Sequence, residues 1–384
     1  MDEVRKGKGD SATAISKFKP KKRQTQLQFI ETIGAGLAGG LIFTLFHWPL
    51  VWMLGPLSAV LIWKLASRRT LFWPVSFRNG GQVLLGYSMG LSFTIESARQ
   101  IARHLPLMAI ITILMVACGL GVALLAARWT GISLQSAVMG TTPGGLSQMV
   151  VLSEEIKGAE PTIVTFMQTI RMLTVIFIVP ALSFHALSGE DVKNVSAFEQ
   201  AGREPGNILF YLFVIGAVLL ATRLAVRFNC PTPYIIGPLM TSAIFTLSGM
   251  PAPQLPPLLT IIAQLCLGVY LGMGIKVNLL GNWRRLLPIS LISGLLIVGC
   301  AFALAYALQR IYPISMATAF LCIAPGGLPE MGVTAHTVHA DVSMVAAYQL
   351  FRVFFILFII PIFLRWIFGK NKEMSVEVRS VTKS

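Results

Sequence analysis

The feature that most constrains this chain is a Pro-Gly-Gly-Leu motif that interrupts two long apolar segments. The first copy occupies residues 143–146, and the second occupies residues 325–328, in the other half of the chain. Pro lacks a backbone N–H and clashes with the preceding helical turn, and Gly makes non-helical backbone accessible. Each of the two apolar segments is therefore predicted to be a broken helix.

The composition places these segments in a membrane. Of the 384 residues, 55% are hydrophobic and 12% are charged, whereas a soluble domain carries about 25% charged residues. Apolar runs near the ~20 residues that cross a bilayer recur along the chain. We therefore predict an all-α, polytopic protein of the cell (plasma) membrane. Unwound backbone at membrane depth is tolerated only where protein or a water-filled cavity surrounds it.

The apolar segments form two series on either side of a polar connector. The net charge of +15 lies in the tails and short loops, which is typical of the cytoplasmic side of a membrane protein and does not indicate a nucleic-acid partner. Within the first series, the third and fourth segments are expected over residues 81–97 and 105–127. The predicted divisions are a disordered basic tail (1–27), a first membrane repeat (28–187), the connector (188–207), a second membrane repeat (208–368) and a C-terminal tail (369–384).

The second series repeats the first at a nearly constant spacing. The shift in residue number that superposes the two Pro-Gly-Gly-Leu motifs also aligns the Gly-Pro-Leu of residues 55–57 with that of residues 237–239. Further pairs aligned by this shift are Gly86 and Gly268, Gly90 and Gly272, and Cys118 and Cys300, followed after the loss of one residue by Gln168 and Gln349, and Arg171 and Arg352. So many anchors at one spacing predict an internal duplication.

The basic loops indicate that the two repeats have opposite orientations. The loop after the second segment carries Lys64, Arg68, Arg69 and Arg78 in the first repeat, whereas the equivalent loop of the second repeat, residues 248–257, is uncharged. Cytoplasmic loops carry the excess of Lys and Arg, so the repeats should cross the membrane in opposite senses. We therefore expect about five crossings plus one re-entrant or broken Pro-Gly-Gly helix in each inverted repeat, with both termini cytoplasmic.

Inverted repeats with broken helices near the bilayer midplane are the architecture of many secondary transporters. Unwound backbone exposes N–H and C=O groups that can hold an ion or a polar solute without any ionised side chain. A tight turn or packing kink is the alternative interpretation. The candidate binding residues at the two breaks are Thr141, Thr142, Pro143, Gly144, Gly145, Ser147 and Gln148 in the first repeat, and Pro325, Gly326, Gly327 and Glu330 in the second.

The helix after each motif carries a Gln-x-x-Arg pair, Gln168 with Arg171 and Gln349 with Arg352. An arginine near the centre of a membrane helix costs ~2.5–3.5 kcal/mol on insertion scales, so each arginine needs a partner. One interpretation is structural, with a salt bridge or a cap on the carbonyl groups of the motif. The other is functional: the arginines hold an anionic substrate, or they neutralise a carboxylate when the coupling ion is absent.

Three acidic residues could serve these arginines. Glu160 and Asp341 each lie eleven residues before one of them, which places acid and arginine on one helical face. Glu330 is asymmetric, because its counterpart is Gln148 and only one copy can titrate there. A carboxylic acid in an apolar site suits proton coupling, whereas an ion pair with Arg352 is the structural alternative.

The paired motifs, over about residues 30–367, resemble the AbrB-type membrane protein family, which is defined by a repeated membrane domain. Members of that family carry labels such as ammonia monooxygenase or regulator of gene expression. The family is also similar, at the level of the fold, to cation/proton antiporters and anion transporters with broken helices, although fold alone does not establish function.

The function expected first is secondary transport of a small solute, with an anion as one possibility and coupling to protons or cations as another. The alternative is a membrane-embedded regulator or sensor that influences gene expression. Oxygenase chemistry needs clustered His or carboxylate ligands, and the chain has only five His, so no enzymatic activity, cofactor or metal site is expected. The expected partners are a small molecule or ion, the lipid bilayer and, because glycines cluster over residues 34–40, a second copy of the chain.

Overall fold

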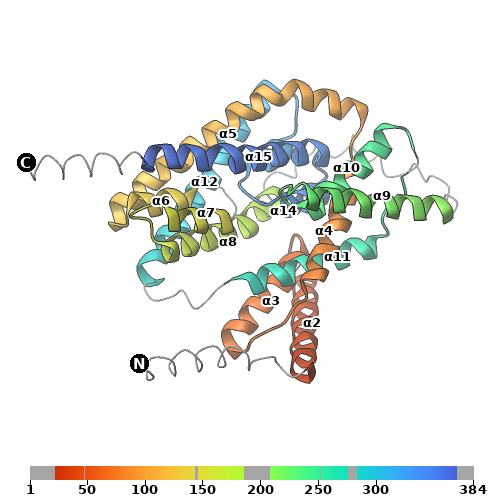
Figure 1. Cartoon of the computed structure of the whole chain (residues 1–384), viewed down its shortest axis with the longest axis horizontal. Coiled ribbons are helices and arrows are strands. Elements are labelled where there is room, and N and C mark those ends of the chain that lie inside the picture. Colours follow the sequence, from red (N-terminus) through yellow and green to blue (C-terminus); the bar gives the residue numbers. More distant parts are fainter. Residues whose placement is uncertain are drawn as a thin grey trace, which may run out of the picture.

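The computed structural model describes residues 22–46, 48–142, 146–185, 208–250, 252–275 and 283–369 (Figure 1). All regular secondary structure in this part of the chain is helical. The helices are α2 (Lys22–Leu45), α3 (Val51–Ser67), α4 (Val75–Gly90), α5 (Ile95–Thr130), α6 (Leu134–Thr141), α7 (Leu146–Glu155), α8 (Pro161–His185), α9 (Ile208–Arg227), α10 (Pro233–Leu247), α11 (Pro257–Gly274), α12 (Trp283–Ile311), α13 (Met316–Ile323), α14 (Leu328–Thr337) and α15 (Val342–Gly369).

The predicted tails and connector fall mostly outside this description. Helix α2 begins at Lys22, inside the stretch 1–27 that was predicted to be a disordered tail. The rest of that tail, the connector 188–207 and the C-terminal tail beyond Gly369 lie outside the described residues.

Seven described helices are long and apolar enough to cross a membrane: α2, α5, α8, α9, α11, α12 and α15. Helices α3 and α10 are shorter and also apolar. Large apolar side chains such as Leu41, Leu220 and Phe358 lie exposed on these helices. Such an apolar exterior suits contact with lipid, because polar and charged side chains are costly to place in the hydrocarbon region. The all-helical fold with several membrane-spanning candidates is therefore as predicted.

The described helices pack as two groups (Figure 1). Helices α2–α4 and α9–α11 contact one another and are called the glycine-packed group here. Helices α5–α8 and α12–α15 form the broken-helix group, which contains both Pro-Gly-Gly-Leu motifs. The two groups meet where α4 contacts α14 and α15. In the view of Figure 1, α2 and α3 lie at the lower end, and α5, α6 and α15 lie above and to the left.

Glycine allows the close crossings of the glycine-packed group. A Cβ atom on Gly86 of α4 would lie 2.5 Å from the carbonyl oxygen of Ile235 in α10, and one on Gly268 of α11 would collide with the carbonyl oxygen of Met53 in α3. Backbones approach so closely only where no side chain intervenes. The shift that superposes the two Pro-Gly-Gly-Leu motifs aligns these two glycines, and it also aligns their two partners. The same kind of crossing is thus made twice.

The glycines of residues 34–40, which suggested a dimer surface, are largely used inside the chain. A Cβ atom on Gly39 would collide with the backbone of Gly55 in α3, and one on Gly40 would lie 2.7 Å from the ring of Trp52. Gly34, by contrast, faces open space. The close packing expected from these glycines therefore joins α2 to α3 within the chain. A homodimer stays a prediction, and the packing of these glycines does not support it.

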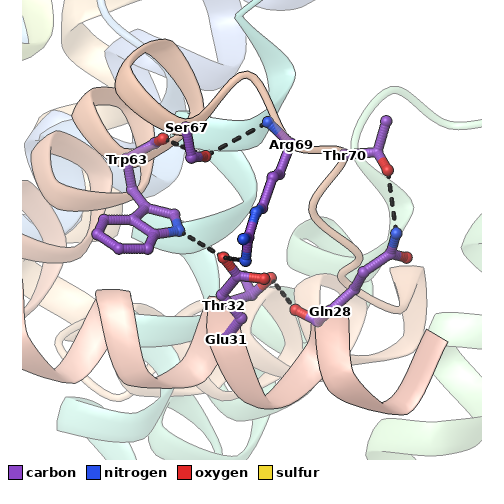
Figure 2. Close-up of polar contacts among 7 residues, drawn as sticks. All are labelled: Gln28, Glu31, Thr32, Trp63, Ser67, Arg69 and Thr70. Carbon is purple, nitrogen blue, oxygen red and sulfur yellow. Dashed lines mark hydrogen bonds and ion pairs between the residues drawn. The ribbon is translucent and has the colours of Figure 1, made fainter. Parts of the chain in front are cut away.

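Polar contacts join α2 to the end of α3 and the loop that follows it (Figure 2). Glu31 accepts a hydrogen bond from Trp63 Nε1 (2.8 Å) and forms an ion pair with Arg69 (3.4 Å). Near it, Gln28 donates to the hydroxyl oxygen of Thr70 (3.0 Å). These contacts hold the basic loop of the first predicted repeat against α2.

Candidate functional site

Both predicted helix breaks are present. The first motif separates α6 from α7, and the second separates α13 from α14. Pro143, Gly144 and Gly145 lie outside the described residues, and so do the side chains of Ser147 and Gln148. At the second break, the N–H of Gly326 donates to the carbonyl oxygen of Ala324 (2.8 Å), and Gly327 adopts an extended conformation directly before α14. Pro325 lies between Ala324 and Gly326.

Arg171 of α8 caps the C-terminal end of α6. Its Nη1 donates to the carbonyl oxygens of Thr141 (2.9 Å) and Thr142 (2.5 Å), and its Nη2 donates to Gln168 Oε1 (2.7 Å). Gln168 in turn donates to the carbonyl oxygens of Met139 (2.5 Å) and Thr142 (3.0 Å). The last carbonyl groups of a helix lack partners within the helix and carry partial negative charge. The guanidinium and amide groups therefore satisfy the end of α6.

Arg352 of α15 caps the C-terminal end of α13 in the same way. Its Nη1 donates to the carbonyl oxygens of Ile323 (3.2 Å) and Ala324 (2.6 Å). Its Nη2 donates to the carbonyl oxygen of Gly326 (2.6 Å) and to Gln349 Oε1. Gln349 donates to the Ala324 carbonyl oxygen (3.1 Å) and to an earlier carbonyl oxygen of α13 (2.8 Å). The structure thus brings both Gln-x-x-Arg pairs to the breaks.

The two arginines form a cationic pair away from water. Arg171 is 7% exposed and Arg352 is 6% exposed, and their positive charges are near enough to repel each other. Neither forms an ion pair with an acidic residue in the described part of the chain. Arg171 Nε is buried and has no hydrogen-bond partner. Like charges held together away from water are costly, so the pair is suited to binding an anion.

The acids that were expected to face the arginines begin their helices instead. Asp341 Oδ1 accepts a hydrogen bond from the backbone N–H of Met344 (3.0 Å), which is an N-terminal cap on α15. The backbone N–H of Glu160 donates to the hydroxyl oxygen of Ser136 (2.7 Å) at the start of α8. Neither acid forms an ion pair with the arginines in the described part of the chain. Of the two structural alternatives, a salt bridge or a cap on carbonyl groups, the cap is the one observed.

Glu330 lies in the first turn of α14, directly at the second break. It is 6% exposed, and its Oε2 atom has no hydrogen-bond partner. A Cβ atom on Gly327 would collide with Oε2, so the carboxyl group lies against the break itself. The ion pair between Glu330 and Arg352, which was the structural alternative, is not formed.

The threonines at the first break contribute backbone groups to the site. The hydroxyl groups of Thr141 and Thr142 donate to carbonyl oxygens one turn earlier in α6 (2.9 Å and 2.6 Å), and both residues are buried. Only their carbonyl groups meet Arg171. The carbonyl groups of Ile323 and Ala324 do the same for Arg352. Their apolar side chains gave no sign of this, although the shift that superposes the two Pro-Gly-Gly-Leu motifs aligns them with the two threonines.

A water-sized cavity lies between the two helical groups. Its volume is about 20 Å³, enough for one water molecule. The side chains around it come from α4, α11, α14 and the start of α15, and the polar ones are Ser88, Thr260, Gln264 and His336.

Similarity to known proteins identifies the family. The profile of the family described as transition state regulatory protein AbrB matches residues 52–368. The chain is 24% identical over 383 residues to YhjN of Bacillus subtilis (strain 168), covering 95% of this chain and 99% of the relative. It is 27% identical over 327 residues to a protein of Escherichia coli (strain K12) named as a regulator, AbrB, covering 85% of this chain and 92% of the relative. The chain therefore belongs to the AbrB family, as its paired motifs predicted.

Proposed function

We propose that this protein is a secondary transporter of a small anionic solute that binds between the two helix breaks. One observation carries the proposal: Arg171 and Arg352 are both buried, each at one of the two helix breaks, and neither pairs with an acidic residue in the described ranges. A buried charge in a membrane protein is expensive and is a functional-site hypothesis by default. The carbonyl oxygens at the two helix ends offset part of this charge, and a bound anion would offset the rest. In this proposal the protein carries out no catalysis.

We further propose that residues 28–187 and 208–368 are inverted repeats around this site. The helix contacts support a two-fold relationship between the two halves, because contacts come in matching pairs. Helix α3 contacts α11 as α10 contacts α4, and α8 contacts α12 as α15 contacts α5. A two-fold relationship produces such reciprocal contacts. Together with the opposite placement of the basic loops, it favours alternating access to one central site.

A membrane-embedded regulator is the second candidate function. The descriptions of the matching family and of the Escherichia coli relative both use the language of regulation. Such a protein would bind the same anion at the arginine pair without carrying it across the membrane. Both candidate functions therefore predict anion binding at the arginine pair, but only the transporter predicts movement of the anion across the membrane.

Uptake by reconstituted protein separates the two candidates. The purified chain would be placed in proteoliposomes with an imposed pH gradient, and labelled monocarboxylates, dicarboxylates, phosphate and sulfate would be offered in turn. We expect saturable uptake of at least one anion, with competition by its chemical relatives. Anion binding without uptake, together with altered transcription after gene deletion, would favour the regulator. Absence of both uptake and binding across the panel would reject the arginine pair as an anion site.

A further inference from the structure

We infer that Glu330 is a proton-binding site, and that a proton at Glu330 and an anion at the arginine pair favour each other's binding. The inference rests on the proposed function, because it assigns the coupling ion of the same site. It makes the transport a proton–anion symport, in which both species bind from the same side.

The first support is the Oε2 atom of the Glu330 carboxyl group. This atom is the one carboxylate oxygen among the described side chains that is buried without a hydrogen-bond partner. Burying a bare charge is costly unless it is paired and hydrogen-bonded. A protonated carboxyl group carries no charge and gains an O–H donor. The Glu330 carboxyl group is therefore placed to bind and release a proton.

No described cation neutralises Glu330 directly. Helix α14 packs against α4, α8, α13 and α15. The described charged and titratable side chains on these helices and on α14 are Arg78, Tyr87, Arg171, His185, Cys322, Tyr348, Arg352 and His336. None of the cations among them forms an ion pair with Glu330. A proton can therefore neutralise the carboxylate in place without displacing any described cation.

The second support is the short path between Glu330 and Arg352. Arg352 Nη2 donates to the carbonyl oxygen of Gly326, and the Glu330 carboxyl group lies against the next residue, Gly327. The two side chains therefore lie at neighbouring residues of one break without touching. A proton on Glu330 removes a negative charge from beside the arginine pair, which raises the affinity for an anion. Binding linkage is reciprocal, so the anion also favours the proton.

The third support is the chemical difference between the two breaks. The sequence places neutral Gln148 at the position that corresponds to Glu330. The two arginines are therefore accompanied by one titratable acid rather than two. Gln at position 330 also reproduces the chemistry of the first break, so Glu330→Gln is a substitution that the fold should accept.

Water can approach this helix from the interface between the two helical groups. The water-sized cavity is lined by Gly332, Val333 and His336 of α14, with Val333 one helical turn beyond Glu330. The polar side chains of Gln264 and His336 line this cavity and could hydrogen-bond to a water molecule in it. This gives the proton an aqueous approach to α14.

Infrared difference spectroscopy of the purified full chain tests the proton site without any transported solute, with pH as the only variable. We expect a carboxyl C=O band that titrates between about pH 4 and about pH 9, is absent from Glu330→Gln, and is retained in the matched control Glu154→Gln, since Glu154 is exposed. We also expect Arg352→Gln to move the titration to higher pH, because a nearby positive charge stabilises the carboxylate. A band that persists in Glu330→Gln, or a midpoint unchanged in folded Arg352→Gln, would overturn the proposal.

The outcome is separable from that of the proposed function. If Glu330 titrates but no anion is bound or taken up, the transporter proposal fails and the proton site stands. If anion uptake is found but is unchanged by the pH gradient and by Glu330→Gln, the anion site stands and the coupling is rejected.

Discussion

Arg352 combines two roles that one substitution can separate. Its guanidinium group caps three carbonyl groups around the second break, and its charge is half of the cationic pair. Arg352→Lys keeps the charge and loses the planar fork of donors. We expect this variant to retain anion uptake with a KM raised about tenfold, which corresponds to about 1.4 kcal/mol. Arg352→Gln should abolish uptake. Equal uptake by the two variants would show that the residue acts only as a helix cap.

Gln349 tests the structural part of the site. It is fully buried, donates to two carbonyl oxygens of α13 and accepts a hydrogen bond from Arg352. Gln349→Leu leaves these groups without partners, and each unsatisfied buried polar group costs about 1–3 kcal/mol. We expect a clear fall in the melting temperature of the purified protein, and no fall for Gln26→Leu, whose side chain is exposed. An unchanged melting temperature for Gln349→Leu would contradict the described capping network.

The sequence pointed to the charged and polar members of the site but not to their partners. Hydropathy makes an arginine in a membrane helix conspicuous, so Arg171 and Arg352 could be predicted. Their partners are backbone carbonyl groups, which every residue carries, and Ile323 therefore looked like any other apolar residue. Glu330 could be identified by its asymmetry with Gln148, whereas the absence of its ion pair with Arg352 depends on side-chain positions that no pattern specifies.

At the scale of helices, the crossings made by glycine can be tested in matched pairs. Gly86→Ala and Gly268→Ala would each force a Cβ atom into a neighbouring backbone, and overpacking of this kind costs about 1–3 kcal/mol. We expect both variants to melt earlier than the wild type. Gly80→Ala is the control on α4, because no atom lies within 4 Å of its added Cβ, and alanine favours a helix by about 1 kcal/mol over glycine. Equal stability of Gly80→Ala and Gly86→Ala would refute the α4–α10 crossing.

Contact between α5 and α12 can be tested through two native cysteines. Cys118 and Cys300 are free thiols that lie close to each other, and the shift that superposes the two Pro-Gly-Gly-Leu motifs also aligns them. With a protease site introduced into residues 188–207, mild oxidation should join the two fragments through a disulfide. Cys118→Ser should abolish the joined band. Fragments that stay separate in the oxidised wild type would contradict this packing.

Helix existence could be predicted better than helix ends. The fourth apolar segment was expected over residues 105–127, whereas α5 begins at Ile95. Hydropathy missed this start because Glu96, Arg99 and Arg103 precede the apolar run, although a helix can carry such charges on an exposed face. The true start is marked by the reciprocal hydrogen bonds of a capping box, in which the Thr94 side chain accepts from the Ser97 backbone N–H.

At the scale of the whole molecule, the proposed inverted topology predicts which side of the membrane each loop faces. Trp129, near the end of α5, and Ile311, at the end of α12, are both exposed and would be equivalent positions of the proposed repeats. In a cysteine-free background, we expect Trp129→Cys and Ile311→Cys to react with an impermeant thiol reagent from opposite sides of the membrane. Reaction of both from the same side would show that the two halves are parallel.

The central claim is that the arginine pair at the two breaks binds a small anion. The most direct measurement is a high-resolution experimental map of the reconstituted protein with the anion that the uptake panel selects. We expect density for that anion between the breaks, within hydrogen-bonding distance of the unpartnered Nε of Arg171. An acidic side chain paired with both arginines, or an anion bound elsewhere with the arginine pair unoccupied, would contradict the account.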